Sequence, residues 1–140
     1  MGAWSADSKT HVAHMQSGDF YGSEQSVRID RDQSVTIEFI DSIGDKKVLR
    51  DNLPLLEGEV IDASVMNRNA LRSFLAEQLD EARDQGVLFS LHMKATMMKV
   101  SDPIIFGHCV DAYLGDLLED HGDTLQSAGF NSNNGLNDFY

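Results

Sequence analysis

Two lysines stand in an unusually apolar stretch, LHMKATMMKVSDPIIFGH, which covers residues 91–108. Lys94 follows a short apolar run at residues 87–93 and precedes an irregular segment and a helical pattern. Ligand crevices often form at the carboxyl ends of strands, and a lysine that is partly desolvated there can exchange protons near neutral pH. The same pattern is also typical of a lysine whose aliphatic part covers a core while its ammonium group reaches water. The residues alone favour this second interpretation for Lys94, and they predict that Lys99 is an exposed or ion-paired charge.

Histidines offer a second possible chemistry, which is metal binding. His11 and His14 have a spacing found in some zinc sites, but the single cysteine, Cys109, is far away in the sequence. We therefore expect no metal site, and we expect the other histidines to be structural, with His92 alternating into the apolar run. Cys109 lies in a helical apolar pattern and is predicted to be a small core residue.

Composition limits the possible partners. The chain has 140 residues, with 11 basic and 23 acidic side chains and a formal net charge of −12. An acidic surface repels the phosphate backbone, so we expect no nucleic-acid partner. There is no apolar leader and no apolar run of about 18 residues, so we expect no membrane partner and a cytoplasmic location. The sequence also contains no glycine-rich phosphate loop and no Gly-x-Ser-x-Gly nucleophile elbow.

The elements that must position these residues follow from hydrophobic periodicity. By length we expect a single domain, residues 1–140, that begins with an irregular, aromatic-containing lead over residues 1–25. A β region is predicted over residues 26–66. Within it, apolar and polar residues alternate along SVTIEFI, Gly44 marks a turn, and KKVLRDN follows as a second strand, which is typical of a hairpin. LEGEVIDASVM adds a further strand after a turn at Gly58. Short strands that follow one another in the sequence favour antiparallel pairing.

A helix–strand–helix portion is predicted over residues 67–122. The first helix begins at Asn67 or Asn69, whose side chains can cap it, and ends at Gly86. The apolar run at residues 87–93 is nearly continuous, which is typical of a strand buried on both faces.

The second helix is predicted to begin at the capping candidates Ser101 and Asp102, to run to about His121 and to end at Gly122. Residues 123–140 are predicted to form a turn-rich link. The fold class is therefore α+β, in which a short antiparallel β region precedes the helix–strand–helix portion.

Longer strings of residues carry a resemblance to a known family. The stretch LHMKATMMKVSDPIIFGH resembles the corresponding segment of the monomeric-type, NADP-dependent isocitrate dehydrogenases, and so do MGAWSADSKTHVAHMQSGDFYGSE, GEVIDASVMNRNALRSF and NNGLNDFY. The resemblance covers essentially all 140 residues. It implies that the chain corresponds to an internal piece of the large α/β domain of a much longer enzyme.

The resemblance implies an oxidoreductase with a defined reaction and a role for one residue. The family oxidises isocitrate by hydride transfer to NADP and then decarboxylates oxalosuccinate to 2-oxoglutarate and CO2, with Mg²⁺ or Mn²⁺ polarising the carbonyl. By motif, the family's catalytic lysine in Leu-His-x-Lys-Ala-Thr-Met-Met-Lys matches Lys94, which is implied to act as an acid/base or as an electrostatic partner. The substrate-gripping segment, the partner tyrosine, the metal-binding aspartates and the NADP-binding residues have no match here, so Asp102 and Asp138 are not assigned as metal ligands.

Two classes of function therefore remain as hypotheses. The chain is either a piece of an NADP-dependent isocitrate dehydrogenase that is inactive alone, or a non-catalytic domain for binding or assembly. The aromatic residues Trp4, Phe20 and Tyr21 are expected to pack on parts of the longer enzyme that are absent from this sequence. Without those parts we expect exposed apolar surface, or a homodimer that hides it.

Overall fold

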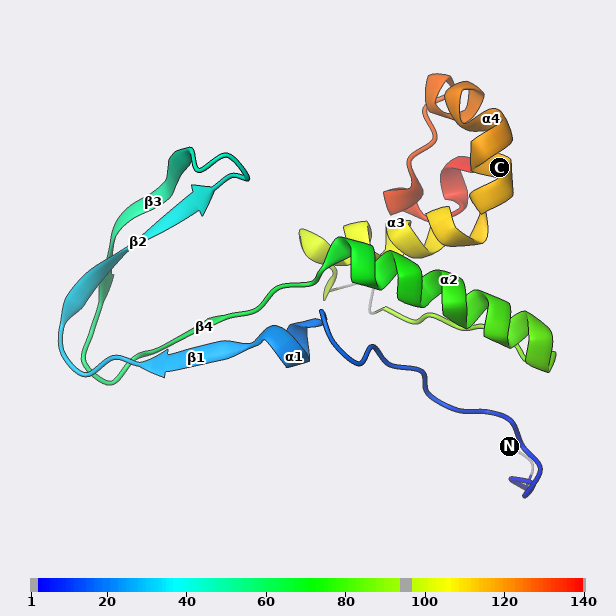
Figure 1. Cartoon of the computed structure of the whole chain (residues 1–140), viewed down its shortest axis with the longest axis horizontal. Coiled ribbons are helices and arrows are strands. Elements are labelled where there is room, and N and C mark those ends of the chain that lie inside the picture. The colour runs from blue at the N-terminus through cyan, green and yellow to red at the C-terminus, as the bar shows by residue number, and fades with distance from the viewer. Residues whose placement is uncertain (1–2, 94–96, 140) are drawn as a thin grey trace. The chain divides into compact units, whose positions relative to one another are not determined.

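The computed structural model describes residues 3–93 and 97–139, which fall into two compact units. Phe20–Val65 form the first, here called the β unit, and Met1–Asp19 with Met66–Tyr140 form the second, the helical unit (Figure 1). The β unit holds the strands and the helical unit holds the three long helices. The predicted α+β class with short antiparallel strands is confirmed.

Two antiparallel strand pairs make up the β unit (Figure 1). A short helix, α1 (Phe20–Ser23), leads into the first strand. β1 (Gln25–Arg28) pairs with β4 (Val60–Ala63), and β2 (Gln33–Ile40) pairs with β3 (Lys46–Leu55). The hairpin predicted from residues 34–40 and 46–52 is thus confirmed, and the β region predicted over residues 26–66 also contains most of β1. α1, in contrast, lies in the lead that was predicted to be irregular.

The side chain of Asp41 holds the turn of the β2–β3 hairpin. Asp41 Oδ1 accepts hydrogen bonds from the backbone N–H groups of Ile43 and Asp45, both at 2.9 Å. Gly44 has a φ of 92°, which a residue without Cβ adopts at no steric cost. The turn therefore forms where the sequence predicts it.

A small core lies where the two strand pairs of the β unit meet. The backbone N–H of Ile29 donates to the carbonyl of Glu59 at 2.8 Å, and the N–H of Gly58 donates to the carbonyl of Ile29 at 2.9 Å. Ile29 is 2% exposed and Leu55 is 7% exposed, whereas most other side chains of the unit face solvent. The strands are therefore fixed mainly by backbone pairing.

The helical unit begins its regular structure with α2 (Arg68–Gln85). Asn67 Oδ1 accepts a hydrogen bond from Ala70 N at 3.0 Å, which satisfies one of the free N–H groups of the first turn. Gly86 ends the helix in the left-handed conformation, with a φ of 66°. Both predicted ends of this helix are confirmed, with Asn67 rather than Asn69 as the cap.

The core of the helical unit lies between α2 and α3 (Ser101–Tyr113). Leu71 and Leu75 project from α2 and meet Cys109 from α3. Partly buried apolar side chains surround these three: Met15, Met66, Phe74, Phe89, Leu91, Ile105 and Ala112. The helical spacing of the apolar residues in α2 thus predicts the buried face correctly.

The strand predicted at residues 87–93, buried on both faces, is wrong. These residues have no regular secondary structure, and their side chains alternate between partly buried and exposed. Leu88 is 91% exposed and His92 is exposed, whereas Phe89 and Leu91 pack on the core. A strand requires a backbone ladder with a neighbour, and the described part of the chain provides no strand beside this run.

The second predicted helix is also corrected, because it is two helices. α3 ends before Leu114, whose φ of −93° and ψ of 13° interrupt the helical path, and α4 (Gly115–Ser127) follows. Gly115 comes directly after the break, and glycine is a poor helix former. Gly122, predicted as the end of the helix, lies inside α4.

The residues after α4 pack back on α3. Two short 3-10 turns, η2 (Ser132–Asn134) and η3 (Asn137–Phe139), follow, and η2 contacts α3. The backbone approaches closely at Gly107, where an added Cβ would meet the side chain and backbone of Asn133. A glycine is needed there because of this close approach rather than because of its φ.

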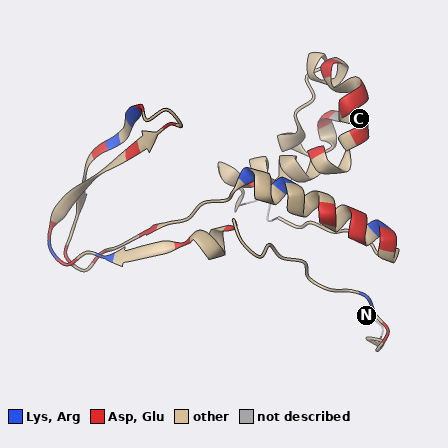
Figure 2. Ribbon diagram, in the orientation of Figure 1, with Lys and Arg blue, Asp and Glu red and all other residues tan. Residues whose placement is uncertain are grey.

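Carboxylates gather on two helices of the helical unit (Figure 2). Four acidic residues lie in α4 without any lysine or arginine: Asp116, Glu119, Asp120 and Asp123.

In the described part of the chain, no helix combines the length and the apolar character needed to cross a membrane.

Candidate functional site

Lys94, the predicted catalytic residue, lies outside the described residues, and the structure describes the segments on either side of it. On the upstream side, Gly86 ends α2 and the N–H of Val87 donates to the carbonyl of Ala82 at 3.0 Å. Phe89 and Leu91 then pack on the core of the helical unit. The chain that leads to Lys94 is therefore held against α2 and α3.

The downstream flank is held by a reciprocal pair of hydrogen bonds. Lys99 N donates to Asp102 Oδ2 at 3.0 Å, and Asp102 N donates to the carbonyl of Lys99 at 3.1 Å. The cap residue of α3 is Val100, which has no side-chain cap bond, so the predicted cap at Ser101 is corrected: Asp102 fixes this end. The side chain of Lys99 is exposed, as predicted.

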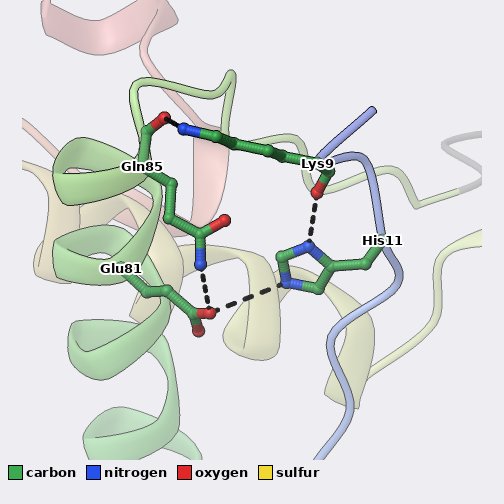
Figure 3. Close-up of polar contacts among 4 residues, drawn as sticks. All are labelled: Lys9, His11, Glu81 and Gln85. Carbon is green, nitrogen blue, oxygen red and sulfur yellow. Dashed lines mark hydrogen bonds and ion pairs between the residues drawn. The ribbon is translucent and has the colours of Figure 1, made fainter. Parts of the chain in front are cut away.

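Four residues form a polar cluster that connects the N-terminal segment to α2 (Figure 3). Lys9 Nζ donates to the carbonyl of Gln85 at 2.9 Å, and His11 Nδ1 lies 2.9 Å from the carbonyl of Lys9. His11 Nε2 lies 4.0 Å from Glu81 Oε1, which also accepts a hydrogen bond from Gln85 Nε2 at 2.7 Å. Because these side chains already have partners within the cluster, it fastens the segment rather than presenting a free acid–base pair.

A cavity of about 520 Å³ lies beside this polar cluster. Its walls come from the N-terminal segment, from α2 and from the run that leads to Lys94, with Thr10, Val12, Phe74, Gln78, Val87 and Ser90 among the lining residues. The walls are mainly apolar side chains and backbone. They contain no thiol, and the one imidazole, of His11, is engaged in the cluster.

A second hollow, of about 710 Å³, lies between α2, α3 and residues 134–137. Cys109 lines it and is buried, which confirms the prediction that this residue is part of the core. Burial raises the pKa of the Cys109 thiol, because an apolar environment disfavours the thiolate. The thiol is therefore a packing group and not a prepared nucleophile.

The remaining histidines do not gather into a site. His14 Nδ1 lies 3.2 Å from the carbonyl of Met15, and His108 Nδ1 lies 3.9 Å from Asp111 Oδ2. Among the residues that the structure describes, no three histidine, cysteine or acidic side chains come close enough together to hold a metal ion. His92, predicted to be buried in a strand, is exposed.

Sequence reasoning missed the polar cluster of Lys9, His11, Glu81 and Gln85. Lys9 and Gln85 are 76 positions apart, and no local pattern connects them. A cation near the carboxyl end of a helix is a favourable arrangement, but the sequence does not identify which cation lies there.

Comparison with known proteins identifies the relatives of this chain. The family model described as monomeric isocitrate dehydrogenase matches residues 1–140. The chain is 53% identical to "Isocitrate dehydrogenase [NADP] 2" of Colwellia maris and 54% identical to "Isocitrate dehydrogenase [NADP]" of Azotobacter vinelandii. It is 48% identical to "Isocitrate dehydrogenase [NADP] 2" of Mycobacterium tuberculosis. Each comparison covers 100% of this chain and 19% of the relative.

All three relatives are named as NADP-linked dehydrogenases, so the class of protein to which they belong is the oxidoreductases. The family follows from the match over the full chain: the protein belongs to the monomeric isocitrate dehydrogenase family. The chain spans about a fifth of the length of the curated relatives it matches. The resemblance found in the sequence is thus confirmed.

Proposed function

We propose that these 140 residues act as part of a longer NADP-dependent isocitrate dehydrogenase, which oxidises and decarboxylates isocitrate to 2-oxoglutarate and CO2. The observation that carries the proposal is the family match over residues 1–140, together with identities near 50% along the whole chain. Because the chain spans 19% of its relatives, the activity belongs to the longer polypeptide and the segment alone is inactive.

Lys94 is the residue to which we assign a catalytic role. Oxidation of a secondary alcohol releases a hydride and a proton, and loss of CO2 leaves an electron pair that a proton must finally quench. An ammonium group beside the reacting oxygen stabilises its developing negative charge and exchanges a proton with it. The packed flanks of Lys94 support this role, because Leu91 on one side and Asp102 on the other are fixed to the helical unit.

The proposed reaction also uses an Mg²⁺ or Mn²⁺ ion and NADP. No group of three metal-capable side chains occurs in the described ranges, and the sequence has no glycine-rich phosphate loop. We infer that neither group is bound fully by these 140 residues.

An assay of NADP reduction with isocitrate and Mn²⁺ tests the proposal. The complete polypeptide that contains these residues should turn over isocitrate, whereas the 140-residue chain should not. An inactive complete polypeptide would instead support the alternative function, a non-catalytic module for binding or assembly. Turnover by the 140-residue chain alone would contradict the proposal that the active site needs further polypeptide.

A further inference from the structure

The segment after α4 contains an Asn-Gly pair, Asn134–Gly135, at the end of η2. An asparagine before glycine is prone to spontaneous deamidation, because glycine has no Cβ that hinders attack by its backbone nitrogen on the asparagine side chain. Every other asparagine of this chain precedes a larger residue. Asn134 is also exposed, so its side chain meets the water that the reaction consumes. By its sequence, Asn134 is therefore the asparagine of this chain most open to the reaction.

We propose that Asn134 is a site of spontaneous deamidation, which the folded η2 turn slows and which, once it has occurred, loosens η2 from α3. In this reaction the backbone nitrogen of Gly135 forms a bond to Cγ of Asn134. The bond from Cγ to Nδ2 breaks, and Nδ2 leaves as ammonia with the proton released from the backbone N–H. Water then opens the cyclic imide and leaves aspartate or isoaspartate at this position. The modification concerns the chain itself and does not depend on the proposed function.

The attacking nitrogen is engaged in the fold. The N–H of Gly135 donates to the carbonyl of Ser132 at 3.0 Å, and the nitrogen must give up this proton before it attacks. Gly135 is also buried, and a Cβ added to it would lie 3.3 Å from Cε1 of Phe106. The hydrogen bond and the packing therefore hold this nitrogen in its unreactive state.

The side chain that reacts is engaged as well. Asn134 Nδ2 donates to Asp138 Oδ2 at 2.7 Å, which joins η2 to η3. This hydrogen bond restricts the side-chain rotation that would bring Cγ to the nitrogen of Gly135. The reaction thus requires η2 to open locally, and its rate in the folded chain follows the population of the open state.

The product cannot restore these contacts. Deamidation replaces the amide that donates to Asp138 with a carboxylate, so two negative charges meet where a hydrogen bond existed. Isoaspartate also lengthens the backbone of the turn by one atom. The neighbouring residue, Asn133, packs closely on Gly107 of α3, where an added Cβ would lie 3.1 Å from its backbone nitrogen. A shift of η2 therefore opens its contact with α3.

Peptide mass spectrometry of the 140-residue chain tests the site. The chain is incubated at mildly alkaline pH with and without urea, and the loss of the amide is followed at each asparagine. We expect Asn134 to react faster in urea than any other asparagine, and at least about 10-fold more slowly in the folded chain than in urea. A rate in urea no higher than that of the other asparagines would overturn the site. Equal rates at Asn134 with and without urea would overturn the protection by the fold.

Two variants examine the hydrogen bond to Asp138. Asp138→Ala removes the acceptor and should raise the rate at Asn134 several-fold in the folded chain, because the side chain is then free to rotate. Glu119→Ala is the matched control, because it removes the same charge from an exposed position in α4. Equal rates at Asn134 in the two folded variants would overturn the protective role of Asp138.

The thiol of Cys109 reports whether deamidation loosens η2, because Cys109 and residues 134–137 line the same hollow. Asn134→Asp reproduces one product of the reaction and should make this thiol react several-fold faster with an aromatic disulfide reagent. Asn137→Asp is the control, since it adds the same charge at an exposed residue beside the same hollow but keeps the bond between Asn134 and Asp138. Equal thiol reactivity in the two variants would overturn the release of η2.

Discussion

Lys9 donates a hydrogen bond from Nζ to the carbonyl oxygen of Gln85 at 2.9 Å, joining two positions that are 76 residues apart. The carbonyl belongs to the last turn of α2, where the orphan C=O groups of a helix carry a partial negative charge. A lysine at this point therefore closes the helix end and fixes the N-terminal segment along it. Lys9 also lines the cavity beside the run that leads to Lys94.

Replacing Lys9 should weaken this attachment. Lys9→Met keeps most of the aliphatic side chain but removes the donor and the charge, and we expect it to lower the free energy of unfolding by about 0.5–1 kcal/mol. Lys47→Met in the 140-residue chain is the matched control, because Lys47 is exposed and has no ion pair among the described residues. Urea titration of the two variants measures the difference. Equal stabilities would contradict the structural role of Lys9.

The carboxyl groups of Glu24 and Asp62 are expected to make the β unit sensitive to pH. A hydrogen bond with Asp62 and the negative charge of that residue raise the pKa of Glu24 above its usual value. A group whose folded pKa is raised stabilises the fold at low pH, and this contribution is lost as the pH rises through the folded value. Glu24→Gln should therefore stabilise the β1–β4 pairing at neutral pH and have little effect at acidic pH, where Glu24 is protonated in both states.

Amide exchange of β1 at neutral and acidic pH measures this effect. Glu57→Gln is the control, because it changes the same charge at an exposed position of the same unit, where the hydrogen bond to Asp32 is made by the backbone N–H. A Glu24→Gln effect that is the same at both pH values would contradict the raised pKa of Glu24.

The thiol of Cys109 should be protected in the folded chain. It is 8% exposed, and burial raises its pKa, so both access and thiolate formation are suppressed. An aromatic disulfide reagent should react at least about 100-fold more slowly with the native chain than with the chain in urea. Because the sequence contains one cysteine, the released chromophore reports on this position alone. Rapid native reaction would show that the α2–α3 core is open.

Two glycines in helices should respond oppositely to the same substitution. An alanine Cβ at Gly107 would meet Asn133, whose backbone N and Cα lie 3.1 and 3.2 Å from the added atom, so Gly107→Ala should destabilise the chain by about 1–3 kcal/mol. Gly122→Ala in α4 meets no heavy atom within 4 Å and should stabilise it by up to about 1 kcal/mol. Thermal unfolding of both variants measures the difference. A Gly107→Ala variant as stable as the original would contradict the packing of η2 on α3.

The sequence predicts those elements whose signals are local. Asn67 and Gly86 bound α2 because capping depends on residues within one turn, and Gly44 forms its turn for the same reason. The alternation of SVTIEFI likewise identifies β2. For the caps of α2 and the turn at Gly44, the interaction that fixes the structure lies within a few positions of the residue that signals it.

The predictions that fail depend on distant partners or on a single backbone angle. The apolar run at residues 87–93 has the composition of a strand, but composition supplies no ladder partner, and the described chain has none for it. The break at Leu114 lies within an apolar stripe that continues on both sides of it. The Lys9–Gln85 contact is missed because nothing local signals an interaction between positions so far apart.

The catalytic role of Lys94 is tested most simply by comparing two lysines of the same stretch, Lys94 and Lys99, in the complete polypeptide. Lys94→Ala should lower kcat for NADP reduction by isocitrate about 100- to 10,000-fold, the usual contribution of a general acid or base. Lys99→Ala should leave kcat nearly unchanged, because the exposed Lys99 side chain is not needed for the backbone hydrogen bonds with Asp102. Lys94→Arg separates proton transfer from charge stabilisation, since arginine keeps the charge but does not release its proton. Full activity of the Lys94→Ala variant would contradict the catalytic role of Lys94.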